Sequence, residues 1–351
     1  MKTTKNILIS PLDWGMGHAS RIIPVIEILR NNGHNIIVAA SGLQKKLLSS
    51  SFPDIIFEDI IPYNIKLSDK KSQNRVILSQ IPKIIIAIKK EHKQVKALIQ
   101  KHNINLVISD NRYGFYNKDV KSIFITHQTH ILLPKKIKFL ENILNKINTR
   151  LINKFDVCWV PDNKNEENLS GILSHKNKKI NNLKYIGILS KFNKLDLEIN
   201  NDILVILSGP EPQRTIFENI IETKLGDTNN TVIIVRGNNK EKKSEYGNID
   251  YLAFANTAEL NKLILQSRII ISRSGYSSIM DYIYLQKKAI IFATPGQTEQ
   301  EYLSEYLSEK NYFIAGNQEQ FNLTDLLLKL EDTKIPNIEL TNGSYKILQD
   351  I

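Results

Sequence analysis

The chain has 351 residues, 42% of them hydrophobic and 24% charged, which is typical of a soluble globular protein with room for two domains. Its single cysteine, Cys158, excludes a disulfide framework and a cysteine-based metal site, and no run approaches the roughly 18 apolar residues of a membrane-spanning helix. The net charge of +11 is uneven: residues 1–195 carry 32 Lys and Arg against 14 Asp and Glu, whereas residues 196–351 carry 15 against 22. We expect a cytoplasmic protein without an export signal, whose basic N-terminal half meets a phosphate-bearing acceptor, an anionic membrane or nucleic acid.

The N-terminal half alternates strand-like and helix-like runs, as a parallel sheet covered by helices requires. An exposed polar connection is expected over residues 163–184, where Asn and Lys are frequent. The elements predicted before it are, in chain order, a strand at 5–10, a helix at 19–31, a strand at 35–40, a helix at 77–101, strands at 106–109 and 123–126, a basic helix at 137–154 and a strand at 156–160.

The alternation restarts after residues 193–202. We predict that these residues link an N-terminal domain, residues 1–192, to a C-terminal domain, residues 203–351. The elements expected in the second domain are strands at 203–207, 231–235, 249–252, 268–271 and 289–292, a loop at 208–213, and helices after that loop, at 257–266 and after residue 275. The predicted fold class is α/β, with two Rossmann-like domains whose parallel sheets face a central cleft.

A glycine-containing motif, DWGMGHASR at 13–21, follows the first strand. Gly15 and Gly17 allow a tight turn and a close approach of substrate to the backbone. His18 would then lie at the N-terminus of the next helix, at the carboxyl edge of the sheet, where a neutral imidazole suits general-base catalysis on a hydroxyl group. The alternative for His18 is simple packing at the helix start. Arg21 either binds phosphate or pairs with an acidic neighbour.

Polar side chains also follow two later strands of this half. Asp110 ends one strand, so its carboxylate can reach the edge where His18 lies and orient the imidazole, although it could equally hold its own loop in an Asx turn. Arg112 and His127 are expected on the acceptor side of the same edge. His127 and His130 lie three residues apart, but no third ligand with suitable spacing is visible, so no metal site is predicted.

The C-terminal half contains SRSGYSSIMD at 272–281, between an apolar strand and a helix-like run. A strand, a Ser-Gly turn and a helix in this order direct backbone N–H groups and the positive end of the helix dipole at a ligand, and a diphosphate is the usual occupant. A second segment, TPGQTEQEY at 294–302, follows the next strand and supplies carboxamides and carboxylates that suit sugar hydroxyls. Together the two segments predict a nucleotide-sugar pocket.

This combination resembles the donor site of GT-B glycosyltransferases, and most closely family 28, whose best-known member is the UDP-N-acetylglucosamine transferase of peptidoglycan synthesis. The likeness covers most of the chain and is most specific at 13–21 and 268–302. The block Gly-x-Gly-His-x-x-Arg is also similar to the motif of UDP-sugar hydrolases of bacterial nonulosonate synthesis. The resemblance implies two Rossmann-like domains and no cofactor.

The resemblance also implies roles for single residues. It makes His18 the base and Asp110 its partner, and it places Gly15, Gly17, Arg21, Arg112 and His127 on the acceptor side. The residues expected to contact the donor are Arg214, Phe254, Ala255, Ser274, Gly275, Tyr276, Ser277, Ser278, Asp281, Gln297, Gln300 and Glu301. Asp281 stands where the family has a Glu that holds the ribose, and Glu301 stands where it has a Gln that touches the sugar.

The function predicted is inverting, metal-independent transfer of a sugar, with an N-acetylhexosamine as one candidate, from a UDP-sugar to the hydroxyl of a lipid- or phosphate-linked acceptor. No Asp-x-Asp metal motif accompanies either site, so backbone N–H groups, a helix dipole and arginine would stabilise the departing UDP. The alternatives are a UDP-sugar hydrolase and a non-catalytic sugar-nucleotide-binding protein.

Residues 133–154 contain six basic residues and one acidic residue, with apolar residues at helical spacing. Two interpretations remain for this segment. It lies on an anionic membrane, which would place the protein at the inner face of the plasma membrane, or it is a surface helix whose apolar side covers the sheet. Nucleic acid is not an expected partner, because no aromatic stacking platform or known binding motif accompanies the charge.

Overall fold

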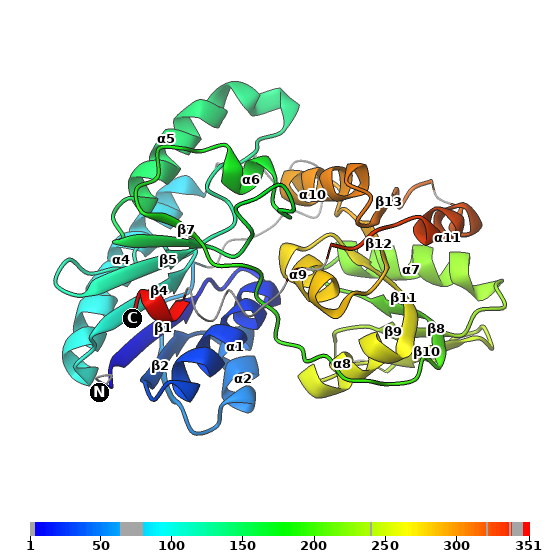
Figure 1. Cartoon of the computed structure of the whole chain (residues 1–351), viewed down its shortest axis with the longest axis horizontal. Helices are drawn as coiled ribbons and strands as arrows, with labels where there is room; N and C mark the ends of the chain where they lie inside the picture. Colours follow the sequence, from blue (N-terminus) through cyan, green and yellow to red (C-terminus); the bar gives the residue numbers. More distant parts are fainter. Residues whose placement is uncertain (1–3, 64–79, 239–240, 321, 337, 339–346) are drawn as a thin grey trace. The chain divides into compact units, whose positions relative to one another are not determined.

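The computed structural model describes residues 4–63, 80–238, 241–320, 322–336, 338 and 347–351. These residues form two compact units (Figure 1). One unit comprises the described residues up to Leu189 together with residues 347–351, and the other comprises those from Ser190 to Ile338. Each unit is a parallel sheet with helices packed on it, as the alternating sequence pattern predicts.

The first unit is built on a seven-stranded parallel sheet with the strand order β3-β2-β1-β4-β5-β6-β7. Its strands are β1 (Asn6–Pro11), β2 (Asn35–Ala40), β3 (Ile56–Asp59), β4 (Leu106–Asp110), β5 (Lys121–Ile125), β6 (Val157–Val160) and β7 (Leu183–Tyr185). Its helices are α1 (Met16–Asn31), α2 (Gly42–Ser51), α4 (Ile81–His102), the 3-10 helix η1 (Lys135–Leu140), α5 (Glu141–Ile152) and α6 (Ile172–His175).

The second unit is built on a six-stranded parallel sheet with the order β10-β9-β8-β11-β12-β13. Its strands are β8 (Asn201–Ile206), β9 (Val232–Val235), β10 (Ile249–Leu252), β11 (Ser267–Arg273), β12 (Ala289–Phe292) and β13 (Ile314–Gly316). Its helices are α7 (Gln213–Gly226), α8 (Thr257–Gln266), α9 (Tyr276–Leu285), α10 (Thr298–Glu309) and α11 (Leu323–Glu331).

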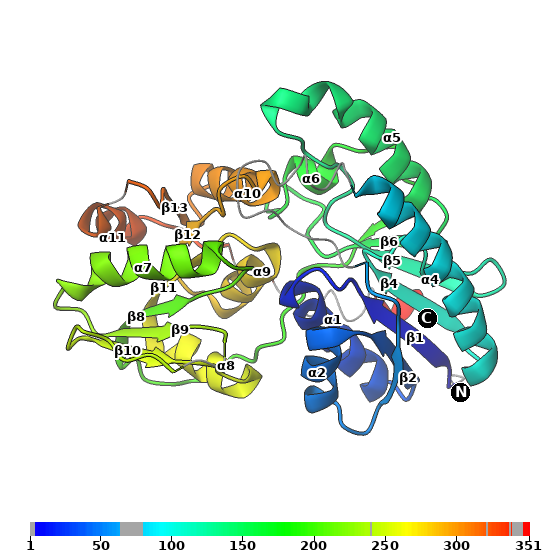
Figure 2. The same ribbon diagram turned by 180° about the vertical axis from the view of Figure 1, so that it is seen from behind.

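In the first unit, α4 and α5 cover the same face of the sheet. The register of the strands puts Leu8, Val107, Phe124 and Cys158 on that face. Leu8 and Val107 belong to the apolar cluster that contains residues of α4, and Phe124 and Cys158 belong to the cluster that contains a residue of α5. The two helices therefore lie side by side over neighbouring strands (Figure 2). The buried thiol of Cys158 is part of this core.

Each sheet has one point at which the strand order reverses, between β1 and β4 in the first and between β8 and β11 in the second. Connections that leave the carboxyl ends of two such strands run to opposite faces, and ligands of open α/β sheets bind in the crevice that results. Pro11 pairs with Asp110 at the first point, and Ile206 pairs with Ser272 near the second. The two motifs singled out in the sequence therefore begin at the two switch points.

The predicted elements form with shifted ends. α1 begins at Met16 instead of residue 19, so that His18 lies inside its first turn. The predicted start of the next long helix, at 77, falls on residues outside those described, and the described helix α4 runs from Ile81 to His102. The polar connection at 163–184 contains α6 and most of β7.

The basic helix predicted at 137–154 divides into η1 and α5, with non-helical backbone angles at Ile137. The interpretation that its apolar side covers the sheet is wrong for Ile143 and Ile147, whose exposed fractions are 57% and 47%. The residues that α5 buries include Glu141, Asn145 and Asn148, and their hydrogen bonds to the chain around residue 130 determine which side of the helix faces inward.

The last described residues of the chain pack on the first unit, although the predicted boundaries assigned them to the second domain. Ile347 is fully buried. The indole Nε1 of Trp159 donates a hydrogen bond to Oδ2 of Asp350 at 2.6 Å, and Lys184 Nζ lies 3.1 Å from the same oxygen. These contacts hold residues 347–351 against β6 and β7.

We expect Asp350→Ala to lower the free energy of unfolding by about 1–2 kcal/mol, because it leaves the indole N–H of Trp159 without its acceptor. Urea denaturation followed by tryptophan fluorescence measures this, and the emission of Trp159 should change as well. Asp196→Ala, at an exposed position, is the matched control. Equal stability of the two variants would show that the C-terminal contact contributes nothing.

Candidate functional site

Two side chains meet where the first sheet reverses its strand order. Gly15 caps the N-terminus of α1 with a φ of 84°, which favours glycine, and places His18 in the first turn of the helix. Asp110 is the last residue of β4. His18 Nδ1 lies 3.1 Å from Asp110 Oδ2. The structure thus brings together the two residues that the sequence proposed as base and partner.

Arg21, one turn further along α1, lies on the same carboxylate. Its Nη2 donates a hydrogen bond to Oδ1 of Asp110, and its Nη1 donates one to Nδ1 of His127 at 3.0 Å. The side chains of Arg21 and Asp110 are 1% and 0% exposed. Of the two alternatives that the sequence left for Arg21, the structure shows the pairing with an acidic neighbour.

The ionisation of Asp110 depends on the two side chains that contact it. Burial acts to raise the pKa of Asp110, but the charges and hydrogen bonds of Arg21 and His18 outweigh it and leave the pKa below its ordinary value. Nδ1 of His18 lies 3.1 Å from Oδ2 of Asp110 and 2.9 Å from Nη2 of Arg21, so it faces both a hydrogen-bond acceptor and a donor. Arginine only donates, so Nδ1 of His127 accepts and its proton lies on Nε2.

Arg112 has no ligand-facing position in this structure, which corrects the expectation that it lies on the acceptor side. Its side chain is fully buried, and its Nε donates to Glu91 of α4. Its Nη1 lies 3.4 Å from Oδ1 of Asp13, whose Oδ2 accepts the N–H of Tyr63 at 2.9 Å. Arg112 therefore helps to hold in place the loop that leads into α1, the helix that carries His18.

The Ser-Gly turn of the second unit lies at the other switch point, between β11 and α9. Ser274 is fully buried, and its hydroxyl donates to the carbonyl of Gln300 at 2.9 Å. Gly275 is the N-cap of α9 and offers no side-chain cap, and the positive end of a helix favours an anion. The ring of Tyr276 is buried in the core. The half-buried residues of the turn are Gly275, Ser277 and Ser278.

Arg273, which the sequence analysis missed, lies directly before this turn. It is 2% exposed, its guanidinium carbon lies 3.9 Å from the ring centroid of Phe217, and burial lowers its pKa to about 10. Its hydrogen bonds go to the carbonyls of Ala293 and Gln213 and to Oε1 of Gln318. These three acceptors are neutral. The position of an Arg at the end of a strand, before a Ser-Gly turn, was the signal that could have revealed it.

Asp281, which was expected to hold a ribose, pairs with Ser190 in this structure. It is 7% exposed, and Oδ1 accepts a hydrogen bond from the hydroxyl of Ser190 at 2.6 Å. Burial raises the pKa of Asp281 to about 6, against the opposing effects of Lys191 and Ser190.

The remaining donor candidates lie in separate segments of the second unit. Arg214 is paired with Glu211 and donates to the carbonyl of Gly237 at 3.0 Å, so its guanidinium already has partners. Phe254, just before α8, is 58% exposed, and Ala255 beside it is half-buried. The ring of Phe254 is therefore accessible to a ligand.

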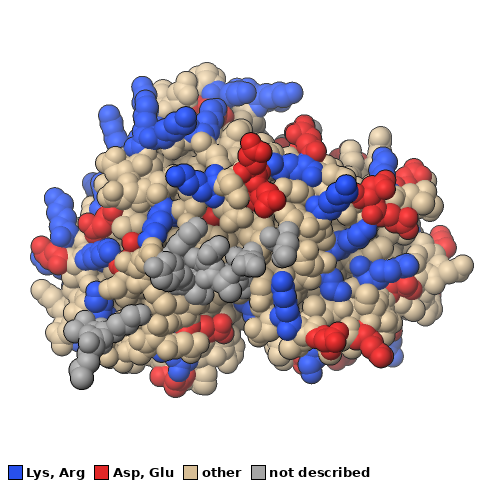
Figure 3. Space-filling view, in the orientation of Figure 1, with Lys and Arg blue, Asp and Glu red and all other residues tan. Residues whose placement is uncertain are grey.

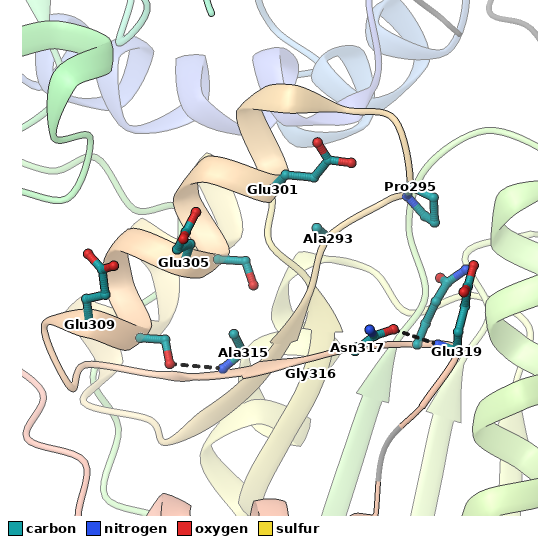
Figure 4. Close-up of a pocket in the computed structure, with 12 residues that line it drawn as sticks. Ala293, Pro295, Glu301, Glu305, Glu309, Ala315, Gly316, Asn317 and Glu319 are labelled. Atoms are coloured by element: carbon teal, nitrogen blue, oxygen red, sulfur yellow. Dashed lines mark hydrogen bonds between the residues drawn. The ribbon is translucent and has the colours of Figure 1, made fainter. Parts of the chain in front are cut away.

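A groove of about 670 Å³ lies at the carboxyl ends of β12 and β13, beside α10 (Figure 4). Glu301, Glu305 and Glu309 project from successive turns of α10 along one side, and Glu319 lies on the other. The groove is of the size that small ligands occupy, and carboxylates accept hydrogen bonds from sugar hydroxyls.

Two of the residues expected to contact the sugar shape the loop beside this groove. Oε1 of Gln300 accepts the N–H of Thr294, and Oε1 of Glu301 accepts the N–H of Gly296, both at 2.9 Å. Gln297, the N-cap of α10, is half-buried. Across the described part of the chain, no three His, Cys, Asp or Glu side chains are grouped so that they could hold a metal ion.

Both halves of the sequence match known protein families. Residues 203–343 match the family described as glycosyltransferase family 28 C-terminal domain, and residues 6–127 match the family described as glycosyl transferase family 1. No curated protein matches the sequence. The two matches cover the His18–Asp110 pair and the Ser-Gly turn.

Solved structures of glycosyltransferases share the fold over almost the whole chain. The spinosyn rhamnosyltransferase SpnG in complex with thymidine diphosphate has a TM-score of 0.65 at 10% identity, covering 98% of this chain and 95% of its own. The calicheamicin glycosyltransferase CalG4 has a TM-score of 0.64 at 10% identity, covering 99% and 94%. Phytolacca americana UGT2 in complex with UDP-2-fluoroglucose and pterostilbene has a TM-score of 0.64 at 12% identity, covering 99% and 94%. The fold is therefore GT-B, as predicted.

We expect Asp281→Asn to stabilise the protein at neutral pH. Its folded pKa of about 6 lies above the value of about 4 in an unfolded chain, so the folded state disfavours the ionised carboxylate that predominates above about pH 6. The cost approaches roughly 3 kcal/mol above the folded pKa and vanishes below about pH 4. Urea denaturation across this pH range should show the variant about 1–3 kcal/mol more stable near pH 8 and equal to the parent near pH 4.

Asp250→Asn, on an exposed residue of β10, is the control and should change the pH dependence little. An Asp281→Asn variant that is less stable at every pH would mean that the ionised carboxylate is needed for its bond with Ser190.

Proposed function

The chain is a glycosyltransferase of the GT-B fold, and from this premise we propose that it transfers a sugar from a UDP-sugar to an acceptor hydroxyl, with inversion and without a metal ion. The observation that carries the proposal is the His18–Asp110 pair at the switch point of the first sheet. We propose a lipid- or phosphate-linked acceptor and, as the first sugar to test, an N-acetylhexosamine.

His18 is the proposed general base. Its Nε2 removes the proton from the acceptor hydroxyl as the oxygen attacks the anomeric carbon, on the face opposite the departing UDP. Asp110 accepts the Nδ1–H of His18, so it keeps the imidazole in the required tautomer and stabilises the imidazolium that forms. Arg21 holds the carboxylate in place through its other oxygen.

The second unit is proposed to hold the donor. The N-terminus of α9, at Gly275, suits the diphosphate, and the guanidinium of Arg273 adds a positive charge one residue before the turn. These groups would stabilise the negative charge of the leaving UDP. The acidic groove beside Gln300 and Glu301 is the proposed position of the sugar hydroxyls.

Measurements of nucleotide binding test most directly which nucleobase the sugar donor carries. Titration calorimetry in EDTA is expected to show binding of UDP in preference to ADP, GDP and TDP. Arg273→Met should weaken UDP binding about 10–100-fold, because a buried charge-assisted contact is lost, and should leave uridine binding little changed. A thermal melt of the variant is the control for folding.

Failure of every nucleotide to bind would overturn the donor-site proposal, and preference for TDP would replace uridine by thymidine. Equal losses of UDP and uridine affinity in Arg273→Met would show that this side chain supports the fold of the loops alone.

The catalytic role of His18 is tested by substitution. His18→Ala is expected to lower kcat for sugar transfer about 10²–10⁴-fold, the range for loss of a general base, with little change in UDP affinity. His34→Ala, in the turn before β2, is the control, because that residue lies at the other end of the strands. Unchanged turnover in His18→Ala would remove the base from the mechanism. Rapid release of free sugar without any acceptor would favour a UDP-sugar hydrolase instead.

A further inference from the structure

The outward side of η1 and α5 combines exposed apolar side chains with basic ones. Phe139, Ile143 and Ile147 are 75%, 57% and 47% exposed. They are spaced four residues apart, as side chains on one side of a helix are. Lys146 and Arg150 follow Ile143 and Ile147 by three residues, so they share that side of α5.

The inward side of α5 is polar, which explains why its apolar residues face outward. Asn145 accepts the N–H of Ile131 at 2.7 Å and donates to its carbonyl at 2.9 Å. Glu141 lies 3.1 Å from Nε2 of His130, and Asn148 donates to the backbone of the same loop. These bonds satisfy backbone groups that would otherwise be buried without partners, and they fix the rotation of the helix.

The neighbouring helix α4 presents a similar outward side. Ile85 and Ile86 are 48% and 54% exposed. Tyr116 links the two helices, because its ring lies 4.5 Å from the ring of His92 in α4 and 5.5 Å from Nζ of Lys154, just after α5. The exposed lysines in the middle of α4 are Lys89, Lys90, Lys93 and Lys96.

The described helices α4, η1 and α5 expose no acidic side chain on this surface. Glu91 is the single Asp or Glu in α4, Glu141 is the single one in η1 and α5, and both are buried. Figure 3 shows Lys and Arg side chains gathered over the part of the first unit where α5 lies. The exposed basic residues of η1, α5 and the turn after it are Lys135, Lys136, Lys138, Lys146, Arg150 and Lys154.

We propose that this outward side of α4, η1 and α5, here called the α4–α5 face, binds an anionic phospholipid surface. Anionic headgroups complement a surface of lysines without carboxylates, and exposed Phe and Ile side chains can enter the boundary between headgroups and acyl chains. No described helix is long and apolar enough to cross a membrane, so the contact is peripheral. The combination of exposed lysines with exposed apolar side chains on one surface favours a lipid partner.

One consequence rests on the proposed function. If the first unit receives the acceptor, binding through the α4–α5 face brings the enzyme to acceptors that are themselves anchored in the lipid. Vesicle binding itself requires neither a donor nor an acceptor, so its result does not depend on whether sugar transfer is found.

Flotation of the full chain with vesicles tests the proposal. The probes are phosphatidylcholine vesicles and vesicles in which part of the phosphatidylcholine is replaced by phosphatidylglycerol. The parent protein is expected to float with the anionic vesicles alone, and less so as salt is raised. Lys146→Glu with Arg150→Glu should lower the partition coefficient by more than about 25-fold, since each basic residue near such a surface contributes about fivefold.

The apolar and basic contributions are separated by a second variant and a matched control. Ile143→Ser with Ile147→Ser should also reduce flotation while leaving transfer to a soluble acceptor unchanged. The control, Leu328→Ser with Lys329→Glu, changes the same residue types at exposed positions of α11 in the second unit and should float like the parent.

Absence of flotation with anionic vesicles would overturn the proposal. Flotation that persists in both α4–α5 face variants would place the lipid contact elsewhere and would overturn it equally. Sedimentation that shows a dimer dissociating in Ile143→Ser with Ile147→Ser would identify the stripe as a contact between two copies of the chain instead.

Discussion

The buried carboxylate of Asp110 is the group on which the first site depends. A buried charge is costly unless it is paired, and the strand order places Asp110 where two residues of α1 can reach it. Arg21 occupies one oxygen and His18 the other. Nη2 of Arg21 also lies 2.9 Å from Nδ1 of His18, so the three side chains form one contact group. Glycine at position 15 is what lets α1 begin close enough for these contacts, and Arg112 braces the preceding loop from the core.

At the second switch point the buried charge has the opposite sign. Arg273 is buried as deeply as Asp110 is, yet its hydrogen-bond acceptors are carbonyls and one carboxamide. The charge is held by dipoles that do not neutralise it, next to an α9 N-terminus without a side-chain cap. In the first unit the positive charge of Arg21 and the negative charge of Asp110 balance one another beside His18. In the second unit the acceptors around Arg273 carry no formal charge.

The loop after β5 connects the first site to the outer surface. His127 in this loop meets Arg21, and the backbone of the loop around Ile131 needs partners because it is covered by α5. Asn145, Asn148 and Glu141 supply them, so α5 turns its polar side inward. Its isoleucines are consequently exposed. The apolar residues of α5 are therefore exposed because the buried backbone of the loop needs hydrogen-bond partners from the polar side of the helix. The amphipathic pattern of α5 alone would have predicted that its apolar side faces inward.

Much of the architecture could be predicted from local sequence. Apolar runs separated by helical patterns indicated two parallel α/β sheets, and glycine turns after strands indicated where ligand sites begin, because strand burial and turn conformation depend on neighbouring residues. His18 and Asp110 could be paired in advance, since both follow strands at one edge of a parallel sheet. The contacts of the remaining side chains could not be derived in this way.

Side-chain surroundings were decided by the tertiary structure. Arg112 is buried against Glu91, twenty-one positions away in the chain, and Asp281 faces Ser190, ninety-one positions away. The rotation of α5 and the return of residues 347–351 to the first unit likewise depend on partners remote in sequence. The sequence by itself determined the order of strands and helices and the loops that carry the sites. Only the tertiary structure decided which charges are paired and which sides face solvent, because those are properties of contacts between segments that lie far apart in the sequence.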